Sequence, residues 1–175
     1  MLPLLMDPFA TLVERLSREP ESTFRYPDAA GPIEAKLPAS KRESEKRLWD
    51  AALAGTFGPE RPAPGIALDA GCGEGEYLPA LCERFEHVLG LDADARRAHA
   101  ARKRHPGADT FALDLCAPVL GEPAFAGALR FAQSLQVLGH VRVARAAELV
   151  VRLATLLSPG GTLVLAVPYT NGFPD

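Results

Sequence analysis

Short apolar segments alternate with helix-like segments over most of the chain, and this alternation constrains the fold more than any other feature. The expected strands cover residues 66–70, 87–92, 109–114, 129–134 and 162–167. Helical spacing of apolar residues marks the intervening segments 75–85, 93–104 and 141–157. Apolar strands joined by helices form parallel sheets that are covered on both faces. We therefore expect an α/β fold with a doubly wound, mainly parallel sheet.

A stretch rich in proline and glycine, at about residues 59–65, divides the chain because it sustains neither a helix nor a strand. Before it we expect two helices, at 8–18 with Asp7 as N-cap and at 40–54 with a capping box that begins at Ser40. Residues 1–64 are thus expected to form an N-terminal helical segment or lid. Residues 65–175 are expected to form the ligand-binding domain, and residues 158–161 a tight turn before the last strand.

A glycine-rich loop follows the first expected strand. Its sequence is Asp69-Ala70-Gly71-Cys72-Gly73-Glu74-Gly75. Glycines let a ligand approach the backbone, and the free N–H groups at the start of a helix favour an anion such as a carboxylate. The loop departs from the dinucleotide fingerprint because Glu76 occupies the place of the third glycine. Glu74 and Glu76 would repel a pyrophosphate, whereas Asp69 can accept from a cationic amino group, so the loop favours a zwitterion.

This loop resembles the first motif of the class I S-adenosylmethionine-dependent methyltransferases. Four further segments follow in the order of that family, at residues 89–92, 113–115, 134–141 and 157–163. The resemblance covers roughly residues 64–168 and implies a Rossmann-like sheet of order 3-2-1-4-5 that binds S-adenosylmethionine for methyl transfer. The family's sixth and seventh strands have no counterpart, so three explanations stay open: a fragment, a truncated gene product, or a chain completed by a partner.

The resemblance also implies which residues contact the cofactor. They are Asp69, Ala70, Gly71, Cys72, Gly73, Asp92, Ala93, Asp114, Leu115, Ser134 and Leu135. Asp92, about 20 residues after the loop, would accept hydrogen bonds from the ribose hydroxyls. Asp114 would accept from the adenine amine. The alternative interpretations are a surface turn for Asp92 and a solvated strand end for Asp114.

Several residues allow a chemical and a structural interpretation. Cys72 is a thiol at a helix start or a packing residue, and the packing interpretation is preferred. His140 is a general base or a structural residue at a helix start, and again the second is preferred. Trp49 belongs to a lid or docks its helix on the sheet. Arg130 stands where the family has an acidic residue at the start of the fourth strand.

No residue is assigned as catalytic, because methyl transfer depends mainly on aligning the reactants. Contacts with the acceptor are expected from Gln136, Tyr26 and Tyr169. The first hypothesis is a methyltransferase acting on a small-molecule acceptor. The second is a non-catalytic S-adenosylmethionine-binding module, or an inactive fragment that needs a partner. The third is a nicotinamide-dependent oxidoreductase, against which Glu76 counts.

Composition limits the partners and the compartment. The net charge of −3 makes nucleic acid an unlikely partner. The three cysteines lack the spacing of a zinc site or a disulfide framework, so we expect no metal and a reducing, cytoplasmic location. No signal peptide or membrane span is expected. With no strand beyond it, the fifth strand would leave an exposed edge, where a homo- or hetero-oligomer could form.

Overall fold

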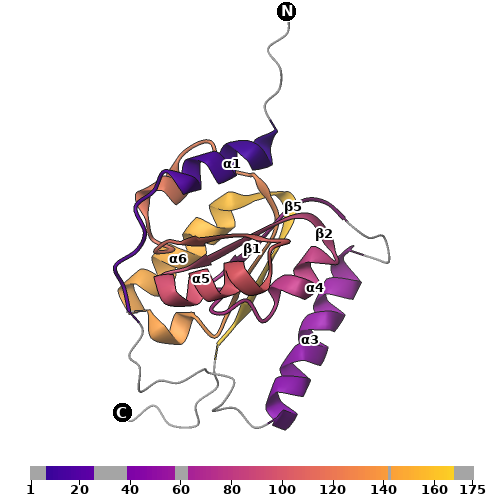
Figure 1. Ribbon diagram of the computed structural model, residues 1–175. Helices are drawn as coiled ribbons and strands as arrows, with labels where there is room; N and C mark the ends of the chain where they lie inside the picture. Colours follow the sequence, from indigo (N-terminus) through magenta and orange to yellow (C-terminus); the bar gives the residue numbers. More distant parts are fainter. Residues whose placement is uncertain (1–6, 26–38, 58–62, 142, 168–175) are drawn as a thin grey trace, which may run out of the picture.

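A five-stranded sheet forms the centre of the protein, for which a computed structural model describes residues 7–25, 39–57, 63–141 and 143–167 (Figure 1). The strands are β1 (Ala63–Ala70), β2 (Phe85–Asp92), β3 (Asp109–Ala112), β4 (Leu129–Leu135) and β5 (Leu157–Ala166). Their order is β3-β2-β1-β4-β5, and every neighbouring pair is parallel. This confirms the predicted Rossmann-like, doubly wound α/β fold.

Helices cover both faces of the sheet (Figure 1). One face carries α3 (Ala39–Phe57), α4 (Leu78–Cys82) and α5 (Ala95–Arg104), and the other carries α1 (Pro8–Ser17) and α6 (Val143–Leu156). Two short 3₁₀ turns, η2 (Pro118–Gly121) and η3 (Leu138–His140), connect the later elements. Because successive strand residues point to opposite faces, each strand supplies both layers with apolar side chains.

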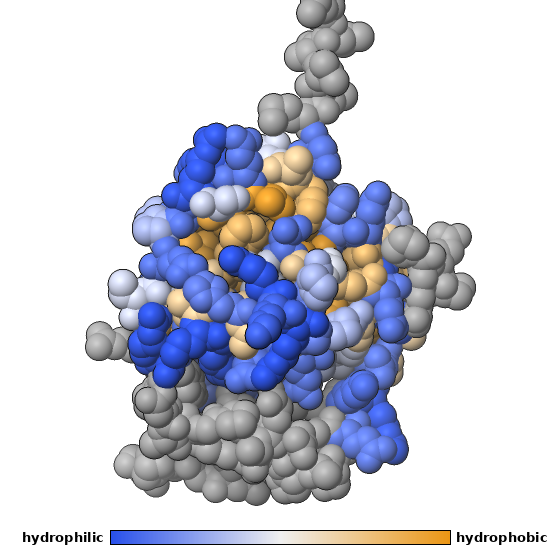
Figure 2. Space-filling model, viewed as in Figure 1, coloured by the Kyte–Doolittle hydropathy of each residue, from blue (hydrophilic) through white to orange (hydrophobic). Residues whose placement is uncertain are grey.

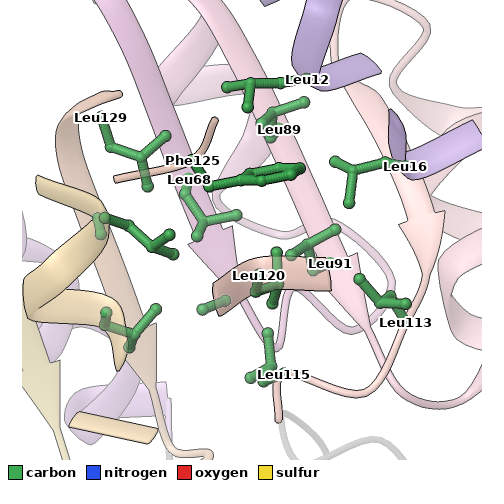
Figure 3. Packing of buried hydrophobic residues seen from close by; sticks show 14 of the residues in the cluster. Leu12, Leu16, Leu68, Leu89, Leu91, Leu113, Leu115, Leu120, Phe125 and Leu129 are labelled. Atoms are coloured by element: carbon green, nitrogen blue, oxygen red, sulfur yellow. The ribbon is translucent and has the colours of Figure 1, made fainter. Parts of the chain in front are cut away.

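Two hydrophobic cores result from this arrangement, one on each face. In the first core, Leu12 and Leu16 of α1 pack with leucines of β1 and β2 and with Phe125 (Figure 3). In the second core, Trp49 and Leu53 of α3 pack with side chains from α4 and from β1, β2 and β4. The two N-terminal helices are thus built into opposite cores of the sheet domain. Whether residues 1–64 act as a lid stays a prediction.

The helix predicted at 75–85 is much shorter than expected. Gly71, Gly73 and Gly75 all have positive φ angles, of 88°, 56° and 90°, so the chain continues in turns until α4 begins at Leu78. Strand β2 then starts at Phe85, which the sequence pattern assigned to the helix. The prediction was wrong at both ends because three glycines and an early strand leave room for little more than one helical turn.

The turn predicted at 158–161 is instead a bulge within β5. Leu157 pairs with Leu129 of β4, and the next pair joins Thr162 to Phe131, so β5 holds extra residues between them. Gly160, with φ of 76°, lies in this bulge. The helix predicted at 40–54 spans Ala39–Phe57, which places Ser40 inside the helix and not at a cap. The side chain of Ser40 lies outside the described part of the chain.

Candidate functional site

The loop after β1 is tied to the carboxyl end of β2 by backbone hydrogen bonds. The amides of Gly71 and Cys72 both donate to the carbonyl of Leu91, at 2.7 and 3.0 Å. The amide of Leu113 donates to the carbonyl of Asp92 at 2.9 Å and so joins the segment after β3 to the same place. The chain ends of three neighbouring parallel strands therefore meet at one edge, where α/β folds bind ligands.

Gly71 brings in a fourth segment, the one that follows β4. A Cβ atom at Gly71 would lie 2.2 Å from Cγ2 of Val137, so the Val137 side chain lies against the Gly71 backbone as closely as only glycine permits. The neighbouring Gln136 has a φ of 61°, a conformation that non-glycine residues rarely adopt. Its amide donates to the carbonyl of Ala166 at 2.8 Å. The sequence pattern did not reveal this contact between the loop and Val137.

Asp92 faces the loop, and the backbone fixes its orientation. Its Oδ2 accepts from the amide of Gly73 and its Oδ1 from the amide of Asp94, both at 2.8 Å. Burial raises the pKa of this carboxyl, while those two amides and the charge of Arg97 oppose the rise. Each oxygen can still accept a further hydrogen bond, because a carboxylate has about four lone-pair sites.

Asp69 is the most deeply buried carboxyl of the site, with 2% of its surface exposed. Burial raises its pKa to about 7, and the charges of Asp92 and Glu76 add to the rise. The side-chain amide of Gln133 opposes this rise, although its Nε2 completes no hydrogen bond within the described residues. Within the described residues, Oδ2 of Asp69 has no hydrogen-bond partner. A buried acceptor without a donor costs free energy, which a cationic donor in the site would recover.

Trp49 connects helix α3 to this acid through Gln133. Its indole Nε1 donates to Oε1 of Gln133 at 2.5 Å, and both side chains are buried. Gln133 lies beside Asp69 across the β1–β4 pair. The sequence analysis took Trp49 as a docking or lid residue and did not single out Gln133. A glutamine within the buried part of β4 was the signal that could have found it.

The remaining predicted residues surround this centre in different ways. Cys72 is buried and free, and burial raises the pKa of its thiol well above its usual value, which fits the packing interpretation. Ser134 is fully buried, and its Oγ has no partner in the described structure. Leu135 packs at the margin of the second core. Ala93, directly after Asp92, is half-buried.

Asp114 lies two residues beyond the end of β3 and is half-exposed. Its Oδ1 accepts from the amide of Cys116 at 2.8 Å, and its Oδ2 lies 3.3 Å from Nη1 of Arg145. The carboxylate therefore already has partners, and contact with a ligand would have to share them. Ala70 and Leu115 are buried in the first core, which leaves their backbones for ligand contact.

Other candidates lie farther from this centre. His140 is exposed and lies in η3, before α6 begins at Val143. Arg130 is exposed at the start of β4, with its guanidinium 5.9 Å from the ring centroid of Phe57, and the strand forms without an acidic residue there. Tyr26 and Tyr169 lie outside the described residues.

A cavity of about 500 Å³ lies away from the loop, between α1 and the outer strand β3. Apolar residues of α1 and β3 line it together with the charged residues Glu19, Glu21, Arg102 and Asp109. Figure 2 shows apolar side chains gathered on the face of the molecule below α1. Among the described residues, no group of acidic, histidine and cysteine side chains is arranged to hold a metal ion. In that same part of the chain, no helix is both long and apolar enough to cross a membrane.

The fold and the edge geometry define a Rossmann-like domain with a small-ligand site at the strand ends. The chain belongs to the methyltransferase domain family, whose model matches residues 41–173. It is 36% identical over 137 residues to a trans-aconitate 2-methyltransferase of Acidovorax ebreus (strain TPSY), covering 69% of this chain and 50% of the relative. A similar protein of Sinorhizobium fredii (strain NBRC 101917 / NGR234) is 35% identical over 63% of this chain and 40% of its own. The chain thus spans half or less of these curated relatives.

Solved structures agree on the fold. An amino pentose methyltransferase from Micromonospora echinaspora, bound to S-adenosylmethionine, superposes with a TM-score of 0.63 at 23% identity, over 89% of this chain and 63% of its own. An S-adenosylmethionine-dependent methyltransferase from Mesorhizobium loti gives a TM-score of 0.53 at 27% identity, over 66% of this chain and 51% of its own. Both similarities agree with the sheet order described above.

Proposed function

We propose that this chain binds S-adenosylmethionine at the glycine loop and belongs to an enzyme that transfers the methyl group to a small-molecule acceptor. The observation that carries the proposal is the pair of buried acids, Asp69 and Asp92, on either side of the loop. Both have raised pKa values, and Asp69 has a buried oxygen without a partner. Such a site favours a ligand that brings positive charge and hydroxyl donors, and it disfavours a pyrophosphate.

Within this proposal each part of the site has one task. Asp69 accepts from the ammonium of the cofactor's amino-acid end, and Asp92 accepts from the ribose hydroxyls. The backbone of Gly71 and Gly73 approaches the ligand where a side chain would obstruct it. The segment Ser134–Leu135 and residues Ala93, Asp114 and Leu115 border the nucleoside. The family membership of the chain supports these assignments.

When bound, S-adenosylmethionine would supply a methyl group on a positively charged sulfur. The sulfur is the leaving group: it would keep the electron pair of the carbon–sulfur bond, while a lone pair of the acceptor would form the new bond to the methyl carbon. The residues of the chain need only hold the two reactants in line, which can contribute about 7–11 kcal/mol to lowering the barrier. A carboxylate or another unprotonated acceptor needs no general base. The absence of an assigned base therefore agrees with the proposal.

The acceptor class is inferred from the relatives. Two curated relatives, both 36% identical to the chain, are named trans-aconitate 2-methyltransferases, which act on a small organic acid by name. The net charge of −3 gives no basic field for nucleic acid.

Three free thiols fit a reducing compartment, which supports a cytoplasmic location.

Isothermal titration tests the proposal directly. We expect S-adenosylmethionine and S-adenosylhomocysteine to bind the wild-type chain and Asp92→Ala to weaken both at least tenfold, about 1.4 kcal/mol. NAD serves as the control ligand, and tighter binding of NAD would refute the proposal. Release of S-adenosylhomocysteine with candidate acids then separates an enzyme from the alternative, a non-catalytic binding module or a fragment that needs a partner.

A further inference from the structure

We propose that Trp49 is a positioning residue for the cofactor: its indole N–H fixes the amide of Gln133, and that amide holds the Asp69 carboxylate ready for the cofactor's ammonium. The inference rests on the proposed function, because it names how that site is kept in its binding form. It links the N-terminal helix α3 to the glycine loop through three buried side chains.

The first step concerns the direction of the Gln133 amide. An indole nitrogen can only donate, so the atom that faces Trp49 at 2.5 Å must be the oxygen of the amide. The two ends of an amide group point apart, and Nε2 of Gln133 is therefore turned away from the indole. Without the indole N–H, nothing in this contact would prevent the amide from presenting its oxygen to the other side.

The second step concerns what the amide nitrogen faces. Gln133 and Asp69 pair across β4 and β1, and Gln133 acts on Asp69 as a donor that lowers its pKa. Neither Nε2 of Gln133 nor Oδ2 of Asp69 has a completed hydrogen bond within the described residues. The donor thus supports the ionised acid while one carboxylate oxygen stays open for a ligand. An amide turned the other way would put an acceptor beside a carboxylate and disfavour its charge.

The third step concerns the balance of charge around Asp69. Asp92, from the end of β2, and Glu76, from the loop, both raise its pKa, and burial raises it most. Gln133 on β4 is the neighbour that opposes them. Since the pKa of Asp69 is already about 7, losing this donor would leave less of the carboxylate ionised near neutral pH. Binding of a cationic ligand would weaken in proportion.

The test compares two ligands and three variants of the full chain. Trp49→Phe removes the N–H and keeps an aromatic ring, Gln133→Met removes the amide at similar volume, and the third variant combines both. The ligands are S-adenosylhomocysteine and methylthioadenosine, the same nucleoside without the amino-acid end. Binding is measured by calorimetry from about pH 6 to about pH 9, spanning the pKa of Asp69. Circular dichroism verifies that each variant is folded.

We expect each single variant to bind S-adenosylhomocysteine about three- to tenfold more weakly near pH 7, as the loss of one hydrogen bond predicts. The ratio of the variant's dissociation constant to that of the wild type should approach one at higher pH, where Asp69 is ionised in every variant. Because both proteins bind the same ligand, the ligand's own titration cancels in this ratio. Affinity for methylthioadenosine should not change. The double variant should lose no more affinity than the single variant with the larger loss, because both residues act along one path.

Leu53→Ala is the matched control, because it loosens the packing of α3 without touching the hydrogen bond. It should lower thermal stability and leave the preference for S-adenosylhomocysteine over methylthioadenosine unchanged. Equal losses for both ligands in Trp49→Phe, or losses that add in the double variant, would refute the positioning role. So would unchanged binding in Gln133→Met, which also decides the matter if Trp49→Phe does not fold. If wild type binds neither ligand, the proposed function itself fails.

Discussion

Asp69 and Asp92 hold charges that their surroundings oppose, and this opposition is typical of binding sites. Burial raises the pKa of both, and the two acids repel each other. A protein selected for stability alone would place apolar or neutral residues there. In the proposed function, the lower stability of the ligand-free fold is offset by affinity towards the cationic cofactor.

Asp69→Asn should make the ligand-free protein more stable at high pH. The folded pKa of about 7 lies above the ordinary 3.8, so the acid's contribution to stability is full below about pH 4 and is lost as pH rises through about 7. Asparagine does not titrate and so avoids that loss. We expect the free energy of unfolding of Asp69→Asn to exceed that of the wild type by about 2–4 kcal/mol near pH 8, and the difference to shrink towards about pH 4. Urea unfolding at several pH values measures it.

The control for this variant is Asp50→Asn on the exposed face of α3, which should change the free energy of unfolding little at any pH. Asp69→Asn should also lose affinity for S-adenosylmethionine while it gains stability. A loss of stability near pH 8 would show that the Asp69 charge is not opposed by the fold.

Gly71→Ala should cost more than its backbone angle alone explains. The φ of 88° strains any side chain, and the added Cβ would also lie 2.2 Å from Val137. We expect cofactor affinity to fall more than tenfold and stability to fall by more than the about 1–3 kcal/mol of backbone strain. Titration and urea unfolding measure the two effects.

Gly160→Ala separates strain from contact, because Gly160 has a φ of 76° with nothing within 4 Å of the added Cβ. It should show the cost of strain alone and leave the cofactor affinity unchanged. Combining Gly71→Ala with Val137→Ala should recover part of the loss. Equal costs at Gly71 and Gly160 would contradict the close approach of the loop to Val137.

Helix boundaries were predicted well where a local signal sets them and poorly where it does not. Asp7 caps α1 as the sequence analysis predicted, and Asp94 caps α5; each accepts from a backbone amide two residues on. Helix α4 was mispredicted because glycine angles and the early start of β2 depend on the surrounding sheet. The bulge in β5 likewise follows from its pairing with β4, which no local pattern encodes.

The same division holds for the site. The sequence singled out the glycine loop and Asp92 because their spacing is local and recurs in a known family, and their contacts with a ligand stay predictions. The contact between Trp49 and Gln133 joins residues 84 positions apart, so only the fold brings them together. The contact of Val137 with Gly71 is equally non-local.

Asp94→Ala should destabilise α5 more than Asp7→Ala destabilises α1. Asp94 is buried, caps the helix through the amide of Arg96 at 3.0 Å and also pairs with its guanidinium. Asp7 is exposed and caps through the amide of Phe9 at 2.9 Å. We expect a loss of about 1–2 kcal/mol for the first variant and about 0.5–1 kcal/mol for the second. Urea unfolding compares them, and equal losses would contradict a role for burial.

At the scale of the whole molecule, β5 is one of the two edge strands of the sheet. Within the described structure, β5 has a hydrogen-bonded neighbour only in β4, and its Leu165 and the following Val167 are 39% and 58% exposed. An edge strand with exposed apolar residues offers itself to a further strand. We therefore expect the chain to self-associate along β5 as its concentration rises.

Leu165→Lys should shift this equilibrium towards the monomer, because a charge on an edge strand opposes strand addition. Sedimentation velocity over a range of concentrations measures the shift. Val151→Lys is the matched control, since Val151 is 64% exposed and belongs to helix α6 and not to the edge strand. A chain that is monomeric throughout, or an equal effect of both variants, would refute the edge as the contact.

Trp49 has a practical consequence as the single tryptophan of the chain. Its ring is buried, lies 5.2 Å from that of Tyr77 by centroid, and is bonded to Gln133 next to the proposed ammonium position. Indole fluorescence responds to the polarity and hydrogen bonding of its surroundings, and the indole emission of this protein has one source, next to the proposed site. An unlabelled sample can thus report its own occupancy in a plate reader while panels of organic acids are screened as acceptors.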